Sequence, residues 1–474
     1  MLIIAHPRDD RFLARAPFQF MPDPQLVEMD QLLDDPRLML QVTHDLIQSS
    51  PEAAWNGRHS TPAEVTLRCS VVRRLMGWSY ATAHLELAGS LQWRWFCRIY
   101  DQAVPNHSAL RDREALIQPV TLHRLNDHVV RVAKRRGVTQ GKQLRADPTV
   151  TATDIHYPTD SRLLSDSVRV LGRIFGRGRQ LIQPRRQGDK QVFRNRSRRA
   201  KQLAFRIAQR MRAKNGQKKP EKQGEFLYRQ LVKIVEQMLA QAEQVLALLR
   251  HHRDKSAKRL VELLEYYLPL VRRVLAQTTQ RVFHQQAVPA HEKVVSLFEP
   301  HTAIIQRGKA PPHETEFGRK IWLSEVDGGL ISEYRILCGN PSDTGPWRES
   351  LKNHRRLFGH PPELATGDRG IYSNANEQAA YRAGVKRVAL PQPGAKTHQR
   401  QEHESQRWFR AAMRFRSGIE GRISVLKRSR RLDRCLNHNE SGLERWVGWA
   451  IITNNLVVMA AKLKSRRRSP RLRT

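Results

Sequence analysis

The chain has 474 residues, enough for roughly two to four domains with a proper hydrophobic core. Its 83 Lys and Arg residues outnumber its 45 Asp and Glu residues by 38 charges, which predicts a polyanionic partner, above all nucleic acid. Four Cys residues stand far apart without a Cys-x-x-Cys pair, so a zinc module and a disulfide framework are both disfavoured and a reducing compartment fits.

The sequence predicts neither export nor a membrane span. The N-terminus MLIIAHPRDDRF becomes charged too quickly for a signal peptide. The apolar stretch WVGWAIITNNLVVMAA is interrupted by Thr453, Asn454 and Asn455, so a buried helix is expected there. We expect a cytoplasmic, nucleoid-associated protein without a membrane partner.

The first 140 residues are predicted to form a helical N-terminal DNA-binding domain. Residues 1–45 show no strong period, whereas apolar residues from about 60 to 136 recur at intervals of three and four. Short helices with Ser or Thr at their starts are compatible with a helix-turn-helix-like domain. A plain helical docking domain is the alternative that this pattern leaves open.

A period-two pattern in residues 145–157 predicts a strand with Asp147 near its start. Residues 158–293 are then predicted to be a helical, basic insertion. Leucine-rich periodicity over 226–250 and 258–284 predicts a helical hairpin, in which Pro269 is expected to kink or split the second helix. A solvated charged face would explain many single cations in 173–222, but less well their uniform sign.

Strand patterns return over 294–338, with a hairpin turn at Asp327-Gly328-Gly329. A helix over 346–358, a buried strand ending at Asp368, a helix, a short strand and helices over 405–435 and 440–464 are expected to follow. This order predicts an α/β fold with a mixed sheet, in which residues 141–460 form the catalytic domain. Residues 461–474 are expected to be a basic disordered tail.

Three side chains in RFRSGIEGRISVLKRS carry the chemistry. Offsets of four and seven place Arg416, Glu420 and Lys427 along one stripe of a helix. A carboxylate between two cations suits a divalent metal flanked by phosphates. Asp147 and Asp368 are the upstream acids that we expect to complete the metal site, because Mg²⁺ prefers hard oxygen ligands.

Each acid has a simpler explanation when taken alone. Asp154 and Asp160 lie close to Asp147 in the sequence, so any of these acids could cap a helix or form an ion pair. Asp368 could be an ordinary turn residue beside Gly370, and Glu420 an exposed ion-pair partner that contributes little stability. Their combination nevertheless points to an enzyme that cuts and joins DNA.

The motifs DPTVTATDIHYPTDSRLL, FEPHTAIIQRGKA, ATGDRGIYSN and RSGIEGRISVLKR resemble those of bacterial insertion-sequence DDE transposases. The chain looks most like the loosely defined ISNCY set, whose relatives carry a Tyr-Arg-Glu-Lys helix signature. The resemblance covers residues 55–460 and implies a ribonuclease H-like core. It also implies that Asp147, Asp368 and Glu420 bind the metal, and that Arg416 and Lys427 contact transposon-end DNA.

The activity that follows from this resemblance is cleavage at transposon ends and 3′-hydroxyl strand transfer into target DNA. Two Mg²⁺ ions are the expected cofactors, for which Mn²⁺ can substitute. Double-stranded DNA, as terminal inverted repeats and target, is the expected partner, and a homodimer or larger assembly is expected on DNA. No Walker-type phosphate loop occurs in the sequence, so no nucleotide cofactor is expected.

The sequence departs from the family signature in several places. Met413 stands where the signature Tyr is expected, and Pro148 follows the first Asp, which predicts an edge position or a strand start. Gly418 and Gly421 weaken the local helix, and a helix that began at Ser417 would leave Arg416 outside it. A catalytically inactive or domesticated DNA-binding protein, or a ribonuclease H-like nuclease without strand transfer, therefore stays open as an alternative.

Overall fold

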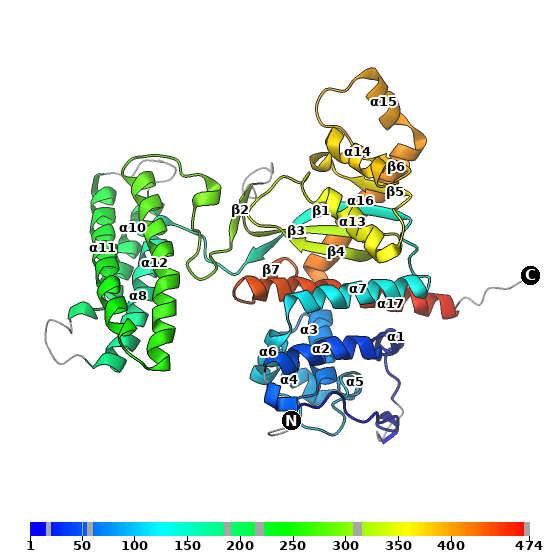
Figure 1. The fold of residues 1–474 in the computed structure, drawn as a ribbon, viewed down its shortest axis with the longest axis horizontal. Helices are drawn as coiled ribbons and strands as arrows, with labels where there is room; N and C mark the ends of the chain where they lie inside the picture. Colours follow the sequence, from blue (N-terminus) through cyan, green and yellow to red (C-terminus); the bar gives the residue numbers. More distant parts are fainter. Residues whose placement is uncertain are drawn as a thin grey trace, which may run out of the picture. The chain divides into compact units, whose positions relative to one another are not determined.

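The computed structural model describes residues 1–15, 20–49, 51–54, 60–183, 191–213, 222–306 and 315–468. The chain divides into two compact units, each with its own core. Unit 1 comprises Met1–Thr153 and Arg319–Thr474, and unit 2 comprises Asp154–Gly318 (Figure 1).

Residues 60–136 of unit 1 contain several helices, as the three- and four-residue spacing of their apolar residues predicts. Two further helices, α1 and α2, precede this segment, although residues 1–45 show no strong period in the sequence. Each begins at a proline, Pro24 or Pro36, where the missing N–H costs no helical hydrogen bond. The helical segments are η1 Leu13–Arg15, α1 Pro24–Leu33, α2 Pro36–Ser49, η2 Pro51–Ala54, α3 Ala63–Met76, α4 Tyr80–Gly89, α5 Leu91–Phe96, α6 His107–Leu116 and α7 Pro119–Arg135.

A mixed sheet follows, so the predicted α/β class is confirmed. Its strands are β1 Gln143–Thr153, β2 Ala303–Gln306, β3 Thr315–Val326, β4 Leu330–Ile336, β5 Leu364–Gly367, β6 Arg387–Ala389 and β7 Arg434–Cys435. The order is β2-β3-β1-β5-β6, while β4 also pairs with β3 and β7 with β1. β1, β5 and β6 run parallel, whereas β3 is antiparallel to β2 and β4.

The β3–β4 hairpin turns where the sequence predicts it, with Val326 paired to Leu330 across Asp327-Gly328-Gly329. Strand structure upstream of it is shorter than expected, because residues 294–302 form no strand. The remaining helical segments of unit 1 are α13 Trp347–Phe358, η4 Arg369–Ile371, α14 Asn374–Arg382, α15 His398–Ser405, α16 Arg407–Ser429 and α17 Glu440–Arg468. The predicted tail is therefore helical over 461–468, and 469–474 lie outside the described residues.

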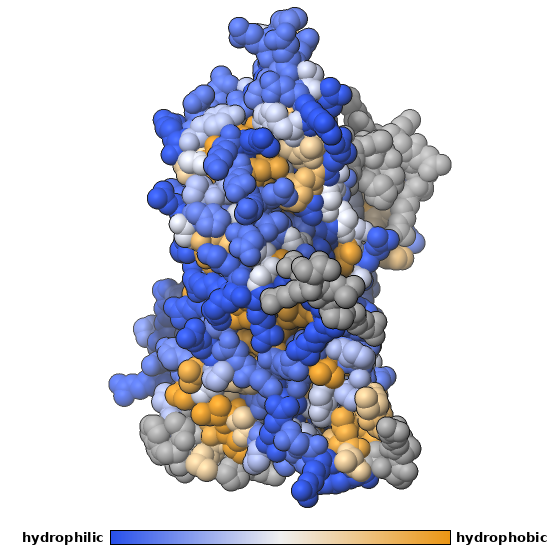
Figure 2. All heavy atoms as spheres, turned by 90° about the vertical axis from the view of Figure 1, so that its right-hand side faces the viewer, coloured by the Kyte–Doolittle hydropathy of each residue, from blue (hydrophilic) through white to orange (hydrophobic). Residues whose placement is uncertain are grey.

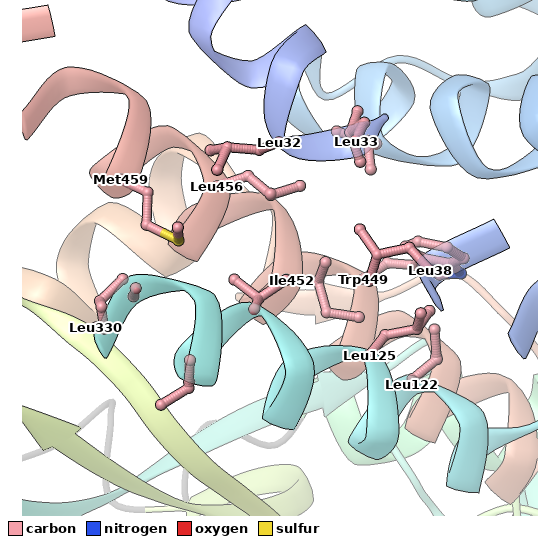
Figure 3. Packing of buried hydrophobic residues seen from close by; sticks show 14 of the residues in the cluster. Leu32, Leu33, Leu38, Leu122, Leu125, Leu330, Trp449, Ile452, Leu456 and Met459 are labelled. Carbon is pink, nitrogen blue, oxygen red and sulfur yellow. The ribbon is translucent and has the colours of Figure 1, made fainter. Parts of the chain in front are cut away.

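Helix α17 joins the N-terminal helices to the sheet. Its Trp449, Ile452 and Leu456 are buried in one hydrophobic cluster that also holds residues of α1, α2, α7 and β4 (Figure 3). Although α17 is long and apolar enough to cross a membrane, 72% of its apolar window is buried inside the protein. The prediction of a buried helix is confirmed, and this burial is consistent with a soluble protein.

The polar interruption of α17 has a structural role. Asn455 accepts a hydrogen bond from the backbone N–H of Ile331 at 2.9 Å and donates to the carbonyl oxygen of Ile331 at 2.8 Å. Its amide also donates to Asn126 of α7 at 2.9 Å. Buried backbone groups need such partners, so Asn455 fastens α17 to both β4 and α7.

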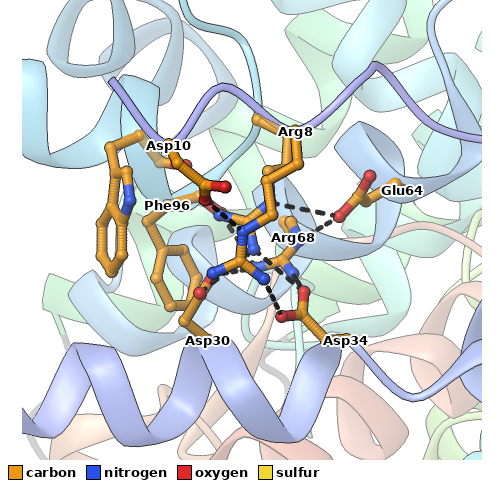
Figure 4. Close-up of polar contacts among 9 residues, drawn as sticks. Arg8, Asp10, Asp30, Asp34, Glu64, Arg68 and Phe96 are labelled. Atoms are coloured by element: carbon orange, nitrogen blue, oxygen red, sulfur yellow. Dashed lines mark hydrogen bonds and ion pairs between the residues drawn. The ribbon is translucent and has the colours of Figure 1, made fainter. Parts of the chain in front are cut away.

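A buried ion cluster ties α1 to α3 (Figure 4). The fully buried guanidinium of Arg68 contacts Asp30 at 2.7 Å, Asp34 at 2.5 Å and Glu64 at 2.9 Å. Arg98 contacts the same two Asp carboxylates at 2.9 Å. Every charge in this cluster has an opposite partner, which burial in a medium of low dielectric requires.

Unit 2 is built on a helical bundle of α8 Asp160–Ile182, α10 Ser197–Ala213, α11 Lys222–Arg250 and α12 Lys255–Val282, with the short η3 Ala290–Glu292 beyond it (Figure 1). The hairpin of α11 and α12 matches the prediction. Of the expected kink or split at Pro269, the split does not occur, because α12 continues through this residue. Asp160 is paired with Arg281 at 3.1 Å within this bundle.

The face of the protein drawn in Figure 2 is mainly hydrophilic. Figure 2 shows one face on which polar side chains predominate and apolar ones form separate patches. Such a surface is ordinary for a protein in water.

Candidate active site

Two of the three predicted metal ligands lie on neighbouring parallel strands. The register of β1 and β5 pairs Ala146 with Gly367. Asp147 and Asp368 are the next residues along each strand direction, so the fold brings together two acids that are 221 positions apart in the sequence. Asp147 is buried in the first half of β1, and Asp368 follows the end of β5.

The backbone around Asp368 turns back towards its own carboxylate. Asp368 caps the short helix η4, where its Oδ1 accepts a hydrogen bond from the N–H of Ile371 at 3.2 Å. A Cβ on Gly370 would lie 3.4 Å from Oδ1 of Asp368 and 3.1 Å from Oδ2 of Asp343. Two carboxylates therefore face the same point beside Gly370.

Burial, followed by the negative charge of Asp343, raises the pKa of Asp368, while Arg416 and the N–H groups of Ile371 and Gly370 oppose this change. An additional cation nearby would stabilise the ionised form of such a carboxylate. Asp343 was not predicted as a site residue. Its Oδ1 forms an ion pair with Lys320 of β3, and only the tertiary fold brings this loop residue to Asp368.

Helix α16 carries the third acid and the predicted cations. It begins at Arg407 rather than Ser417, so Arg416 lies within the helix. The Arg416 Nη1 atom donates to Oε1 of Glu420 at 2.8 Å, and its Nη2 lies 3.4 Å from Oδ2 of Asp147. Arg416 is mostly buried, with 19% of its side chain exposed, whereas the Glu420 side chain is 64% exposed.

Gly418 has a packing role beside these residues. A side chain at this position would overlap the guanidinium of Arg145, which reaches from β1 to the carbonyl oxygen of Phe415. Arg145 is also paired with the buried Glu325 of β3 at 2.7 Å. The glycine that weakens the helix therefore permits α16 to lie close to β1.

The other signature positions lie on or near the same helix. Lys427 is half-buried further along α16, and Met413 packs beside Phe409 and Ala412. Pro148 lies in the middle of β1, which is a central strand, so the expected position at an edge or at a strand start is wrong. The pairing of β1 with β5 ends at Ala146, before Pro148, so this proline interrupts no hydrogen bond to β5.

A cleft of about 770 Å³ opens beside Asp368 and Arg416. Cations dominate its charged lining, since Glu404 is the only other acid among the described residues that line it. The lining cations are Arg369, Lys396, Arg410, Arg414 and Arg416. Arg400 fixes the α15 wall through ion pairs at 2.8 Å to Glu377 and Glu404. The cleft is thus electropositive and lies beside Asp368, one of the candidate metal ligands.

The donor chemistry at this site suits Mg²⁺, because the candidate ligands are all carboxylates. In the present arrangement Arg416 lies between Asp147 and Glu420, and within the described ranges no three His, Cys, Asp or Glu side chains are grouped closely enough to hold one ion. Glu420 is exposed on a helix surface, so its side chain can rotate away from Arg416 without disturbing the core.

Comparison with known protein families finds a similarity in the N-terminal part of the chain. Residues 17–113 match the model of a family described as Transposase domain (DUF772). No curated protein and no solved structure matches the chain. The matched segment holds the ion cluster of Arg68 and most of the N-terminal helices. This match supports a protein of a transposase family with a function related to DNA transposition.

Proposed function

We propose that this chain is a DDE-type DNA transposase with a ribonuclease H-like catalytic core. The observation that carries the proposal is the placement of Asp147 on β1 and of Asp368 directly after the neighbouring parallel strand β5, with Arg416 of α16 in contact with both Asp147 and Glu420. The adjoining cation-lined cleft supports DNA as the substrate, because it offers phosphate partners on one side of the acids.

Asp147, Asp368 and Glu420 would hold two Mg²⁺ ions, which would activate the attacking oxygen and stabilise the leaving oxygen of a phosphodiester. Glu420 must first exchange its contact with Arg416 for the metal site. The freed Arg416 guanidinium can then donate two hydrogen bonds to a phosphate. The cations that line the cleft would hold the DNA strand in place. Lys427, which lies further along α16, would contact the transposon end.

The reaction would proceed in two steps, hydrolysis and then strand transfer. Water attacks the phosphorus at a transposon end, a phosphorus–oxygen bond breaks, and a 3′-hydroxyl is released. That hydroxyl then attacks a phosphodiester of target DNA, so one phosphorus–oxygen bond forms as another breaks, and no nucleotide cofactor is consumed. Two terminal inverted repeats must be held together, for which we propose a homodimer or larger assembly.

The test uses the full chain with duplexes that cover the DNA on either side of its coding region. We expect cleavage that requires Mg²⁺ or Mn²⁺, and joining of a pre-cut end to a plasmid. Glu420→Gln should abolish both reactions while DNA binding remains. The matched control is Glu402→Gln on α15, an acid that is 67% exposed and lies outside the cleft lining. Cleavage that Glu420→Gln leaves intact would refute the proposed site.

A second candidate is a DNA-binding protein with an inactive core. The specific observation in its favour is the ion pairing of Arg416 with both Asp147 and Glu420, which compensates part of their negative charge without a metal. This candidate predicts DNA binding without any metal-dependent cleavage by the wild-type chain. A nuclease without strand transfer would instead cleave DNA but never join a pre-cut end.

A further inference from the structure

All the charged side chains of helix α10 in unit 2 are positive. Its sequence, SRRAKQLAFRIAQRMRA, contains Arg and Lys but no Asp or Glu. The neighbouring helices α8, α11 and α12 each contain acids as well as cations. A helix whose only role was to complete the bundle would need no such bias.

The apolar face of α10 packs into the core of the bundle. Ala200, Leu203 and Ile207 are buried in the core that α10 shares with α8, α11 and α12. The opposite face therefore points to solvent, and Phe205 on that face is 61% exposed. This large aromatic side chain is therefore mostly exposed on a cationic, outward face.

Among the described residues, several cations of α10 lack the ion pairs that some cations of the neighbouring helices form. On α11 and α12, Arg250 is paired with Glu265 at 2.8 Å and Arg272 with Glu243 at 2.6 Å. For Arg198, Lys201 and Arg206 of α10, no carboxylate within the described parts of the chain lies in ion-pair range. Their charge is left for a partner outside the bundle.

The outward residues have the chemistry that reads DNA. Arg198, Gln202, Phe205 and Gln209 follow at offsets of four, three and four, so they form one stripe, and Arg206 flanks it. Arg pairs with guanine and Gln with adenine in the major groove, and Phe contacts the thymine methyl group. The major groove is wide enough to admit an α-helix.

We propose that α10 is a DNA recognition helix that lies in the major groove, with its stripe of Arg198, Gln202, Phe205 and Gln209 against base edges. Lys201 and Arg206, on either side of the stripe, contact the phosphates of the two strands. The inference rests on the proposed function only in taking DNA as the substrate. It adds sequence reading by the insertion, which the site on α16 does not require.

The test is a binding measurement with the full chain and two duplexes. One duplex is selected by the wild-type chain from a randomised pool, and the other is a scrambled sequence of the same composition. The double variant Gln202→Ala, Phe205→Ala should lose about tenfold or more in affinity for the selected duplex and little for the scrambled one. The double variant Lys201→Gln, Arg206→Gln should weaken both complexes alike and reduce the salt dependence of binding.

Arg272→Gln is the control, because this exposed cation of the same bundle is already paired with Glu243. It should bind both duplexes as the wild type does, and thermal melts should show that all variants are folded. Wild-type affinity of both double variants would overturn the proposal, as would an equal loss on both duplexes for the Gln202 and Phe205 variant. Cleavage is not part of this test, so its outcome is separate from that of Glu420→Gln.

Discussion

Arg416 of α16 joins Asp147 of β1 to Glu420 of its own helix, with 3.4 Å and 2.8 Å between the respective nitrogen and oxygen atoms. A guanidinium thus occupies the place between two acids that a divalent ion would share. Metal binding and the release of Arg416 are therefore expected to be coupled, because the same carboxylate oxygens serve both cations.

This coupling can be tested with Arg416→Ala. Without the guanidinium, the acids repel one another more strongly, and the ion meets no competitor. We expect Mg²⁺ to raise the melting temperature of this variant more than that of the wild type. Arg414→Ala, on the same helix and lining the same cleft, should respond as the wild type. Equal Mg²⁺ responses in all three proteins would show that Arg416 does not compete with the ion.

Asp343 is expected to support the site through Lys320. Lys320 is 9% exposed and otherwise donates only to the carbonyl oxygen of Pro341 at 2.9 Å within the described residues. Asp343→Asn removes the opposite charge and should lower the free energy of unfolding by about 1–3 kcal/mol. Glu349→Gln removes an exposed partner of Lys352 and should leave the free energy of unfolding nearly unchanged. Urea denaturation distinguishes the two, and equal small effects would contradict this role.

The ion cluster of the matched N-terminal segment should be essential for folding. Arg68→Met leaves buried carboxylates with one cation fewer, so we expect a loss of about 3–5 kcal/mol in unfolding free energy. Arg8→Ala removes an exposed cation from the same cluster and should cost less than about 1 kcal/mol. Denaturant titrations of both variants provide the comparison, and a mild effect of Arg68→Met would count against the expected desolvation penalty.

Asn455→Leu tests whether the hydrogen bonds of Asn455 hold α17 on β4. The substitution preserves bulk but leaves the N–H of Ile331 without its side-chain acceptor. We expect a loss of about 1–3 kcal/mol in the free energy of unfolding, measured in urea. Full stability in Asn455→Leu would mean that apolar packing alone holds α17 on β4.

His354 predicts a pH dependence of stability. Burial lowers the pKa of this imidazole to about 4 in the folded protein, against 6.5 for the ordinary group, while its Nε2 donates to the carbonyl oxygen of Gly141 at 2.9 Å. The unfolded chain therefore binds a proton more readily. Its contribution to stability is complete above pH 6.5 and is lost as the pH falls from 6.5 towards 4. His354→Gln should be less sensitive over this range in thermal melts, and an unchanged pH profile would contradict the assignment.

Local patterns predicted much of the sheet and the position of its acids. The Asp-Gly-Gly turn indicates the β3–β4 hairpin, and the apolar run before Asp368 indicates β5, because both signals lie within a few residues. The helix expected over 405–435 is likewise found as α16, which begins at Arg407. The role of Gly418 was not predictable, because Arg145, the residue that requires a glycine there, is distant in the sequence.

Tertiary neighbours account for the remaining differences. Asp343 reaches Asp368 only after the loop that follows β4 has folded against η4, and no spacing in the sequence indicates this approach. Likewise, Arg68 looks like one more cation in a basic chain, although it is the centre of a buried ion cluster. The pairing of Arg416 with two acids depends on the separation of β1 and α16, which sequence periodicity does not specify.

The position of α17 limits how this protein can be divided. This C-terminal helix fills the space between the first helices and β4. Dividing the chain near residue 140 would therefore expose buried apolar surface on both fragments. We therefore expect neither fragment to be soluble alone, and the isolated N-terminal segment to aggregate unless α17 is supplied in trans. Exchange of N-terminal segments between relatives would succeed only when their last helix is exchanged as well.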